Sequence, residues 1–203
     1  ERTRFSPCNG AFRYGNRVWK CWNPAGHGSL DLVHAIEQSC DVYYYQLGLQ
    51  IGLGNLLENL KTFFEISQTD IGLPGERHHF IPTLAWFASR YGRWGYGPGV
   101  VLNLSIGQGE ILLTPVEMAY MTLLIARGEA PPPWVIKRIG DREFLPPEPR
   151  SLPYSEKHLK AVRRGMLLAV EGEKGTGRNA RVPGIKVAGK TGTAQNVHGK
   201  DHS

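Results

Sequence analysis

The sequence is short of several features that would assign it to a class at once. No run of 18 or more apolar residues occurs in its 203 positions, so no segment is expected to span a membrane. No charged and then apolar leader follows Glu1, so no signal peptide is predicted. Internal repeats are also missing. The 24 Lys and Arg residues outnumber the 18 Asp and Glu residues, but they are scattered rather than clustered. We therefore expect no nucleic-acid partner.

What is abundant is glycine and proline, with 25 and 14 residues, which predicts many turns and loops. A chain of this length can form one domain with a real core, because it buries roughly 70% of its unfolded surface. We therefore expect a single folded unit with long connections between its helices and strands.

Short aromatic-rich runs near the start predict a β-hairpin, with strands at 11–14 and 17–22 around the turn Gly15-Asn16. Ser29 is a suitable N-cap for a helix that ends at Ser39, and Asp41 can cap the next helix, which runs toward Gly52. A third helix is predicted for 55–65 from the spacing of its apolar residues.

The rest of the chain is expected to alternate loops and helices. Residues 72–99 are predicted to be a long loop with one helical turn near 84–90, in which His78 and His79 are surface residues. Thr114-Pro115 starts a helix that ends at Gly128. After a proline-rich connector come a helix at 155–170 and a strand at 184–188 that continues into 189–195. Helices in the middle and strands at both ends indicate an α+β fold.

Two short motifs can carry chemistry. Ser39-Cys40-Asp41 lies at a junction between two predicted helices, and Lys190-Thr191-Gly192-Thr193 lies at the end of a predicted strand. Taken singly, the first is more often a helix cap and the second a strand end. Together they match two of the three motifs of the penicillin-recognising serine acyl-transferases: S-x-x-K, then S-x-N or S-x-D, then K-T-G.

With these motifs, and with Gly107-Gln108-Gly109 followed by Thr114-Pro115, the chain resembles the class B penicillin-binding proteins. Gly26-His27-Gly28 ahead of Ser39 is similar to the cell-elongation branch of that class. The resemblance implies a penicillin-recognising serine transpeptidase fold, an antiparallel sheet packed with helices plus an all-helical subdomain, truncated at both ends. The chain would then be one partial domain, with a hairpin and metal segment at 8–40, a mainly helical part at 41–180 and the K-T-G strand at 184–197.

The resemblance also implies roles for the residues of both motifs. Ser39 would shuttle a proton, and Lys190 would supply the positive charge that favours this transfer and attracts the terminal carboxylate of the substrate. The hydroxyls of Thr191 and Thr193 would bind that carboxylate, and the Thr193 N–H would form half of an oxyanion hole. Gly192 leaves room for the substrate backbone. Asp41 stands where many relatives have Asn, so it cannot donate an amide N–H.

One motif of the family is missing. None of the serines is followed by a lysine three positions later, so no S-x-x-K occurs in the 203 residues. In the family this motif precedes S-x-N, and we therefore expect the nucleophilic serine upstream of Glu1. The segment by itself is expected to be inactive.

The three cysteines suggest a second site. Cys8, Cys21 and Cys40 have His27 between them, and three thiolates with one imidazole make a complete tetrahedral zinc set. Four protein ligands would close such a site, so its zinc would be structural, and no catalytic cofactor is expected. Members of the resembled branch carry a metal in this segment. The alternative is a Cys8–Cys21 disulfide, with Cys40 a small buried apolar residue and His27 a loop histidine.

The function that the resemblance implies is peptidoglycan D,D-transpeptidation through an acyl-serine intermediate, with stem peptides as substrates and β-lactams as inhibitors. A membrane-embedded glycan polymerase and elongation-complex proteins are the expected partners. The domain is expected on the outer side of the cytoplasmic membrane, with a single-pass anchor outside this segment. Two alternatives stay open: an inactive scaffold for a polymerase, and a β-lactam sensor or hydrolase.

Overall fold

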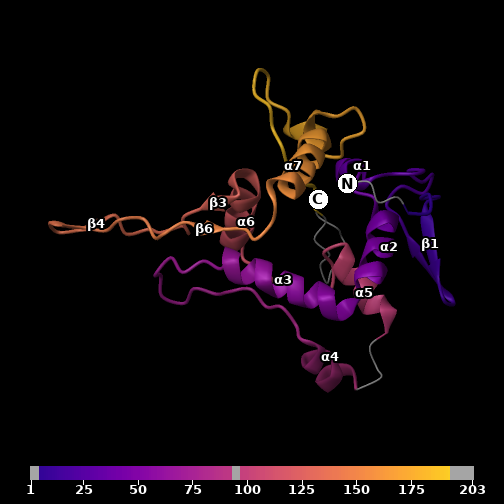
Figure 1. The fold of residues 1–203 in the computed structure, drawn as a ribbon, viewed down its shortest axis with the longest axis horizontal. Helices are drawn as coiled ribbons and strands as arrows, with labels where there is room; N and C mark the ends of the chain where they lie inside the picture. The colour runs from indigo at the N-terminus through magenta and orange to yellow at the C-terminus, as the bar shows by residue number, and fades with distance from the viewer. Residues whose placement is uncertain (1–4, 93–96, 193–203) are drawn as a thin grey trace. The chain divides into compact units, whose positions relative to one another are not determined.

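The computed structural model describes residues 5–92 and 97–192, and Figure 1 shows the order of their helices and strands. The chain divides into two compact units. Unit 1 comprises Glu1–Gln46 and Lys160–Ser203, and unit 2 comprises Leu47–Leu159. None of the helices in the described part of the chain is long and apolar enough to cross a bilayer.

Unit 1 begins with the predicted hairpin. Strand β1 (Ala11–Tyr14) pairs antiparallel with β2 (Arg17–Lys20), and Tyr14 lies opposite Arg17 across the two-residue turn. Gly15 has φ +59° in this turn, a conformation that suits glycine. The second strand ends at Lys20 rather than at residue 22, because the Trp22 N–H donates to the Asp41 carboxylate instead of to the ladder.

The first helix of unit 1, α1 (Leu32–Glu37), starts later than expected. Its N-cap is Asp31 and not Ser29, since the Asp31 carboxylate accepts a hydrogen bond from the His34 N–H at 3.0 Å. Helix α2 (Asp41–Ile51) follows after a short turn, with Asp41 as its first residue. The predicted break between the two helices is confirmed.

The carboxyl-terminal part of unit 1 contains most of α7 (Glu156–Glu171), as predicted, and a short 3₁₀ turn η1 (Arg178–Ala180). The predicted strand at 184–195 is wrong for the residues up to 192, where the structure has no strand; residues 193–195 lie outside the described part. Two backbone donors of this segment are used on α7 instead. The Gly189 N–H bonds the Met166 carbonyl, and the Val187 N–H bonds the Glu171 carboxylate.

Unit 2 is mainly helical, with α3 (Leu53–Ser67), α4 (Leu84–Tyr91), α5 (Pro98–Ser105) and α6 (Pro115–Arg127). The helical turn predicted near 84–90 is confirmed as α4, which has two turns. The loop predicted for the rest of 72–99 is wrong at its end, where α5 starts. Leu57, Phe87 and Leu104 form one buried cluster, which joins α3, α4 and α5. This packing stabilises helices that are too short to be stable alone.

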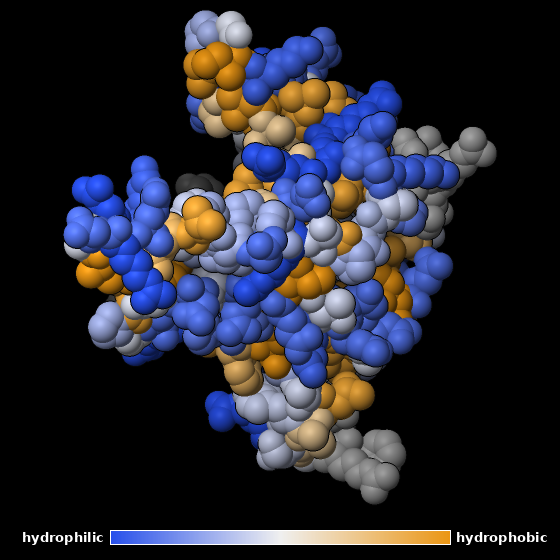
Figure 2. Space-filling model, turned by 60° about the vertical axis from the view of Figure 1, so that its left-hand side comes forward, coloured by the Kyte–Doolittle hydropathy of each residue, from blue (hydrophilic) through white to orange (hydrophobic). Residues whose placement is uncertain are grey.

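A second core in unit 2 consists of Tyr120, Leu124, Ala130, Leu152 and Leu159. It lies where β3 (Glu129–Ala130) pairs antiparallel with β6 (Arg150–Ser151). Between them, the short ribbon of β4 (Arg138–Ile139) and β5 (Arg142–Glu143) extends away from α6 in Figure 1. These strands occupy the proline-rich connector, which we did not predict to contain strands. Apolar residues are also exposed among charged ones, as the mixed colours of Figure 2 show.

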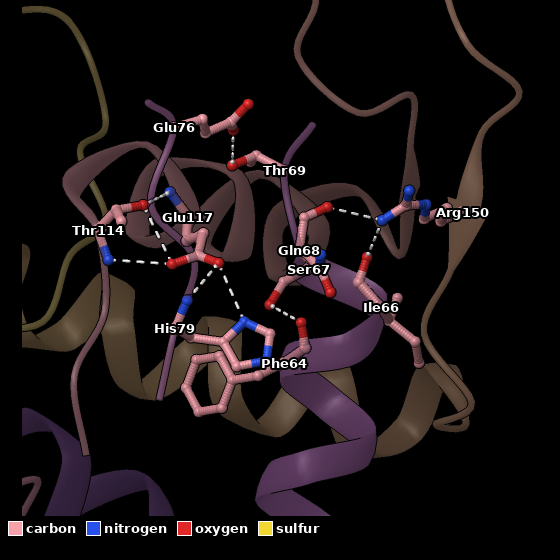
Figure 3. A network of polar contacts seen from close by, with 10 residues as sticks. All are labelled: Phe64, Ile66, Ser67, Gln68, Thr69, Glu76, His79, Thr114, Glu117 and Arg150. Carbon is pink, nitrogen blue, oxygen red and sulfur yellow. Dashed lines mark hydrogen bonds and ion pairs between the residues drawn. The ribbon is translucent and has the colours of Figure 1, made fainter. Parts of the chain in front are cut away.

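Unit 2 also contains a buried polar network, drawn in Figure 3. Glu117, which is fully buried, forms the predicted cap of α6 with Thr114 as a reciprocal capping box. The Glu117 carboxylate also accepts hydrogen bonds from the backbone N–H and the ring Nδ1 of His79, both at 3.0 Å. The start of α6 is thereby tied to the segment between α3 and α4. His79 is thus a structural partner and not the surface residue that we expected.

The same contacts set the protonation of Glu117. Burial alone would raise the pKa of its carboxyl, but hydrogen bonds from the N–H groups of Thr114 and His79 and from both side chains lower the pKa below its ordinary 4.5. A group with a lowered folded-state pKa stabilises the protein above the unfolded-state value. This contribution is lost as the pH falls through the folded-state pKa.

Glu117→Gln should therefore lower the free energy of unfolding of the full-length protein by about 1–2 kcal/mol at neutral pH, because charge-assisted hydrogen bonds become neutral ones. The difference from wild type should shrink below pH 4.5. Urea unfolding between pH 7 and pH 3 measures both effects. Glu148→Gln, at an exposed glutamate, is the control, and equal losses in the two variants would contradict the prediction.

Candidate active site and metal centre

The two predicted motifs meet in unit 1. The Lys190 ammonium donates a hydrogen bond to the Ser39 hydroxyl, although 151 positions separate the two residues. It also donates to the Thr191 carbonyl at 2.9 Å. Partial desolvation lowers the pKa of Lys190, which is still exposed, and the nearby Asp41 carboxylate partly opposes this shift. Lys190 is therefore a better proton donor than an ordinary lysine, and it lies beside a hydroxyl that can relay the proton.

Ser39 occupies an unusual backbone conformation. Its φ of +53° lies in the left-handed region, which non-glycine residues seldom adopt and which costs of order 1 kcal/mol or more. Local bonds hold it there, because the Ser39 N–H donates to the Ile36 carbonyl and the Cys40 N–H to the Ala35 carbonyl. The result is a tight turn, Gln38–Asp41, with the Cys40 side chain buried and Lys190 on the Ser39 hydroxyl.

Trp22 holds this turn from the side of the hairpin. Its indole N–H donates to the carbonyl oxygens of Gln38 at 3.0 Å and Ser39 at 2.9 Å. Its backbone N–H donates to the Asp41 carboxylate at 2.9 Å. We did not predict this role, since an aromatic residue in a hairpin pattern carries no signal for a contact with residues 16 to 19 positions away.

Asp41 has an altered acidity as well as a structural partner. Burial raises the pKa of its carboxyl to about 6, the Trp22 N–H lowers it, Cys21 raises it and Lys190 lowers it. Because one carboxylate oxygen accepts from the Trp22 main chain, this side chain connects the hairpin to the first turn of α2.

The substrate-binding residues that we predicted are placed only in part. Thr191 is half-buried, and its hydroxyl lies 2.8 Å from that of Thr176, a residue that we did not single out. Gly192 is exposed, and a Cβ at this position would meet nothing within 4 Å, so space for a ligand backbone is open there. Thr193 lies outside the described residues.

The four predicted metal ligands form a compact cluster. Donor atoms of Cys8, Cys21, His27 and Cys40 all lie within 4.8 Å of one another, and the three cysteines are 3%, 6% and 1% exposed. All three thiols are free, so the alternative Cys8–Cys21 disulfide is not formed in this structure. A hydrogen bond from Cys40 lowers the pKa of Cys21, and the same contact raises that of Cys40.

The geometry of this cluster fits zinc. With Zn–S of about 2.3 Å and Zn–N of about 2.0–2.1 Å, a tetrahedral site has S···N edges of about 3.6 Å. The His27 Nδ1 lies 3.6 Å from the Cys8 sulfur and 3.5 Å from the Cys21 sulfur. These four residues can therefore hold a zinc ion, and they leave no ligand position open.

Comparison with known proteins agrees with these motifs. The family described as "Penicillin binding protein transpeptidase domain" matches residues 6–203. The chain is similar to "Peptidoglycan D,D-transpeptidase MrdA" of Haemophilus influenzae, with 33% identity over 95% of this chain and 31% of that protein. Its counterpart of the same name in Acinetobacter baumannii is 31% identical over 86% of this chain and 26% of its own length. The chain thus spans less than a third of these relatives.

Solved structures of penicillin-binding proteins also match the chain. A complex of penicillin-binding protein PBP2 with MreC from Helicobacter pylori matches with a TM-score of 0.82 and 30% identity, over 99% of this chain and 37% of that one. Pseudomonas aeruginosa PBP2 in complex with WCK 5153 also has a TM-score of 0.82, with 29% identity over 98% and 44% of the two chains. The predicted α+β transpeptidase fold is confirmed by these matches.

Trp22→Phe tests the hydrogen bonds from the Trp22 indole to the Gln38–Asp41 turn, because it keeps an aromatic ring but removes the indole N–H. We expect the free energy of unfolding to fall by about 1 kcal/mol, the usual net value of a hydrogen bond. Denaturant unfolding of the full-length protein measures this loss. Trp134→Phe, at an exposed tryptophan of unit 2, is the matched control. An equal, small effect in both variants would show that the indole N–H contributes nothing.

Proposed function

The chain belongs to the penicillin-binding protein transpeptidase domain family, and from this membership we propose that it is part of a peptidoglycan D,D-transpeptidase. The reaction would cross-link stem peptides ending in D-Ala-D-Ala through an acyl-serine intermediate, and β-lactams would inhibit it by acylating the same serine. The observation that carries the proposal is the contact of Lys190 with Ser39, because it joins two of the family's three motifs.

Ser39 and Lys190 would move the protons that acyl transfer requires. The nucleophilic serine must lose a proton, and the leaving amine must gain one. Since the Ser39 hydroxyl accepts its hydrogen bond from Lys190, its own proton is free to point toward a leaving group. Lys190, whose pKa is lowered by partial desolvation, can then replace that proton. This arrangement supports a relay from lysine through serine to the amine.

The remaining residues would bind the substrate and support the relay. Thr191 and Thr193 would bind the terminal carboxylate of the stem peptide, next to the charge of Lys190, and exposed Gly192 would leave room for the peptide backbone. Asp41 would fix the turn through Trp22. The nucleophile is not among the 203 residues, since the sequence contains no S-x-x-K motif. We expect this motif in a preceding part of the protein.

We also propose a structural zinc ion held by Cys8, Cys21, His27 and Cys40. The free thiols, their burial and the edge lengths of the cluster support this assignment. When bound, zinc supplies a fixed cross-link and no catalytic chemistry, because four protein ligands saturate it. Cys40 lies between Ser39 and Asp41, so these ligands would connect the hairpin to the active-site turn.

The partners and location of the protein are further parts of the proposal. A PBP2 relative forms a complex with MreC, and another matching structure describes a peptidoglycan synthase complex that coordinates polymerisation and cross-linking. By analogy, this protein would act with a membrane-embedded glycan polymerase and elongation proteins. It would be anchored to the cytoplasmic membrane, with this domain on the outer side.

Lys190→Ala should reduce the second-order rate of acylation of the full-length protein by benzylpenicillin by roughly 100- to 10,000-fold, because proton transfer and carboxylate binding both lose their charge. A time course of adduct formation by mass spectrometry measures this rate. Lys186→Ala, at an exposed lysine four positions upstream, is the control. A rate within about threefold of wild type in Lys190→Ala would remove this lysine from the site.

The same experiment separates the transpeptidase from a scaffold and from a hydrolase. A scaffold would form no adduct at all, and a hydrolase would form an adduct that is rapidly released. A stable adduct on an upstream serine supports the transpeptidase.

Zinc binding predicts about one equivalent of metal in full-length protein purified without chelator, with Zn–S near 2.3 Å by X-ray absorption. Cys8→Ser, His27→Ala and Cys40→Ser should each lower both metal content and thermal stability, because the binding free energy of a structural metal contributes to folding. His34→Ala is the matched control, since His34 is an exposed histidine that bonds Asp31.

The disulfide alternative predicts a different pattern. Cys8→Ser and Cys21→Ser would then behave alike, Cys40→Ser would be nearly silent, and reductant would destabilise the protein as much as chelator. Metal-free protein with a mapped Cys8–Cys21 bond would end the zinc proposal.

A further inference from the structure

Thr176 lies between two glycines in the loop that follows α7, and it contacts both halves of the candidate active site. Its hydroxyl is 2.8 Å from the Thr191 hydroxyl in the K-T-G motif. Its backbone N–H donates to the carbonyl of Glu37 at 3.3 Å, and its hydroxyl lies 3.5 Å from the same oxygen. Glu37 is the last residue of α1, immediately before the Gln38–Asp41 turn.

The flanking glycines fix the position of this threonine. A Cβ on Gly175, which is buried, would lie 2.4 Å from the Ala169 carbonyl and 2.5 Å from the Leu168 carbonyl. The Gly177 N–H donates to the Ala169 carbonyl at 2.8 Å. The loop is therefore packed directly against the backbone of α7, and Thr176 has a defined place with respect to Thr191.

We propose that Thr176 is a positioning residue, which orients the Thr191 hydroxyl toward the carboxylate of the substrate. This inference rests on the proposed function, because it assumes that Thr191 binds the terminal carboxylate of a stem peptide or a β-lactam. Thr176 itself does not touch the substrate.

The role of Thr176 depends on where the two hydroxyl protons point. Each threonine has one proton to donate. When a carboxylate is bound, Thr191 must give its proton to that anion, so the hydrogen bond between the hydroxyls requires Thr176 to donate to Thr191. A hydroxyl that receives such a bond is a better donor to an anion, because hydrogen bonds in a chain polarise one another. Without the carboxylate, Thr176 can turn its proton to Glu37 and accept from Thr191 instead.

The test compares the acylation of full-length protein by benzylpenicillin and by its uncharged methyl ester. Thr176→Val removes the hydroxyl at nearly constant volume, and we expect the acylation rate constant for the acid to fall roughly 5- to 10-fold, the effect of one hydrogen bond. The rate constant for the ester should change less than twofold. Thr176→Ser keeps the hydroxyl and should restore the wild-type ratio between acid and ester.

A double-mutant cycle completes the test. If Thr176 acts through Thr191, the variant with both Thr176→Val and Thr191→Val should be no slower with the acid than Thr191→Val alone. Thermal unfolding identifies folded variants, and Thr176→Ala replaces Thr176→Val if valine unfolds the loop.

Each other outcome contradicts the inference. Wild-type rate constants with both compounds in Thr176→Val show that the hydroxyl is not used, and equal losses for acid and ester show that it only supports the loop. Both results leave the transpeptidase proposal intact, since the protein is still acylated. Wild-type protein that forms no adduct with either compound would overturn the proposed function, and this inference with it.

Discussion

The turn between α1 and α2 is the constraint on which the rest of unit 1 depends. Hydrogen bonds hold it from three sides: the Trp22 indole donates to the carbonyls of the turn, the Thr176 N–H to the carbonyl of Glu37 just before it, and Lys190 to the Ser39 hydroxyl. The cysteine cluster around Cys40 is the fourth contact. These contacts come from the hairpin, from the loop after α7 and from the K-T-G motif. The φ of +53° at Ser39 is tolerated because contacts from several segments hold the turn in this conformation.

Local patterns predicted the elements whose causes are local. The hairpin was predicted from its two-residue turn, and α6 from Thr114-Pro115 at its start, because turn and cap residues act within a few positions. The pairing of Ser39 with Lys190 was also anticipated, but the family motifs carried this information and helical or strand periodicity did not. The compact set of three cysteines and His27 was predicted from ligand chemistry, with support from the resemblance to the cell-elongation branch.

The features that we missed depend on contacts between distant segments. Only one turn of helix α4 was predicted, and its full length is stabilised by the packing of Phe87 on α3 and α5. The predicted strand before Lys190 has an extended apolar sequence, yet its backbone bonds α7 in the described residues. Trp22 and Thr176 looked like ordinary hairpin and loop residues, since a hydrogen bond to a remote carbonyl leaves no trace in the neighbouring sequence.

The separation of 151 positions between Ser39 and Lys190 has a consequence for the order of folding. The contacts among Cys8, Cys21, His27 and Cys40 close only short loops, whereas the contact of Lys190 with Ser39 closes a loop that spans most of the chain. Contacts with large sequence separation form slowly, because loop closure must precede them. Each doubling of a loop adds only about 0.6 kcal/mol, so the late contact is delayed without being prevented. The contacts of the hairpin and of the cysteine cluster with the turn can thus form before Lys190 reaches Ser39.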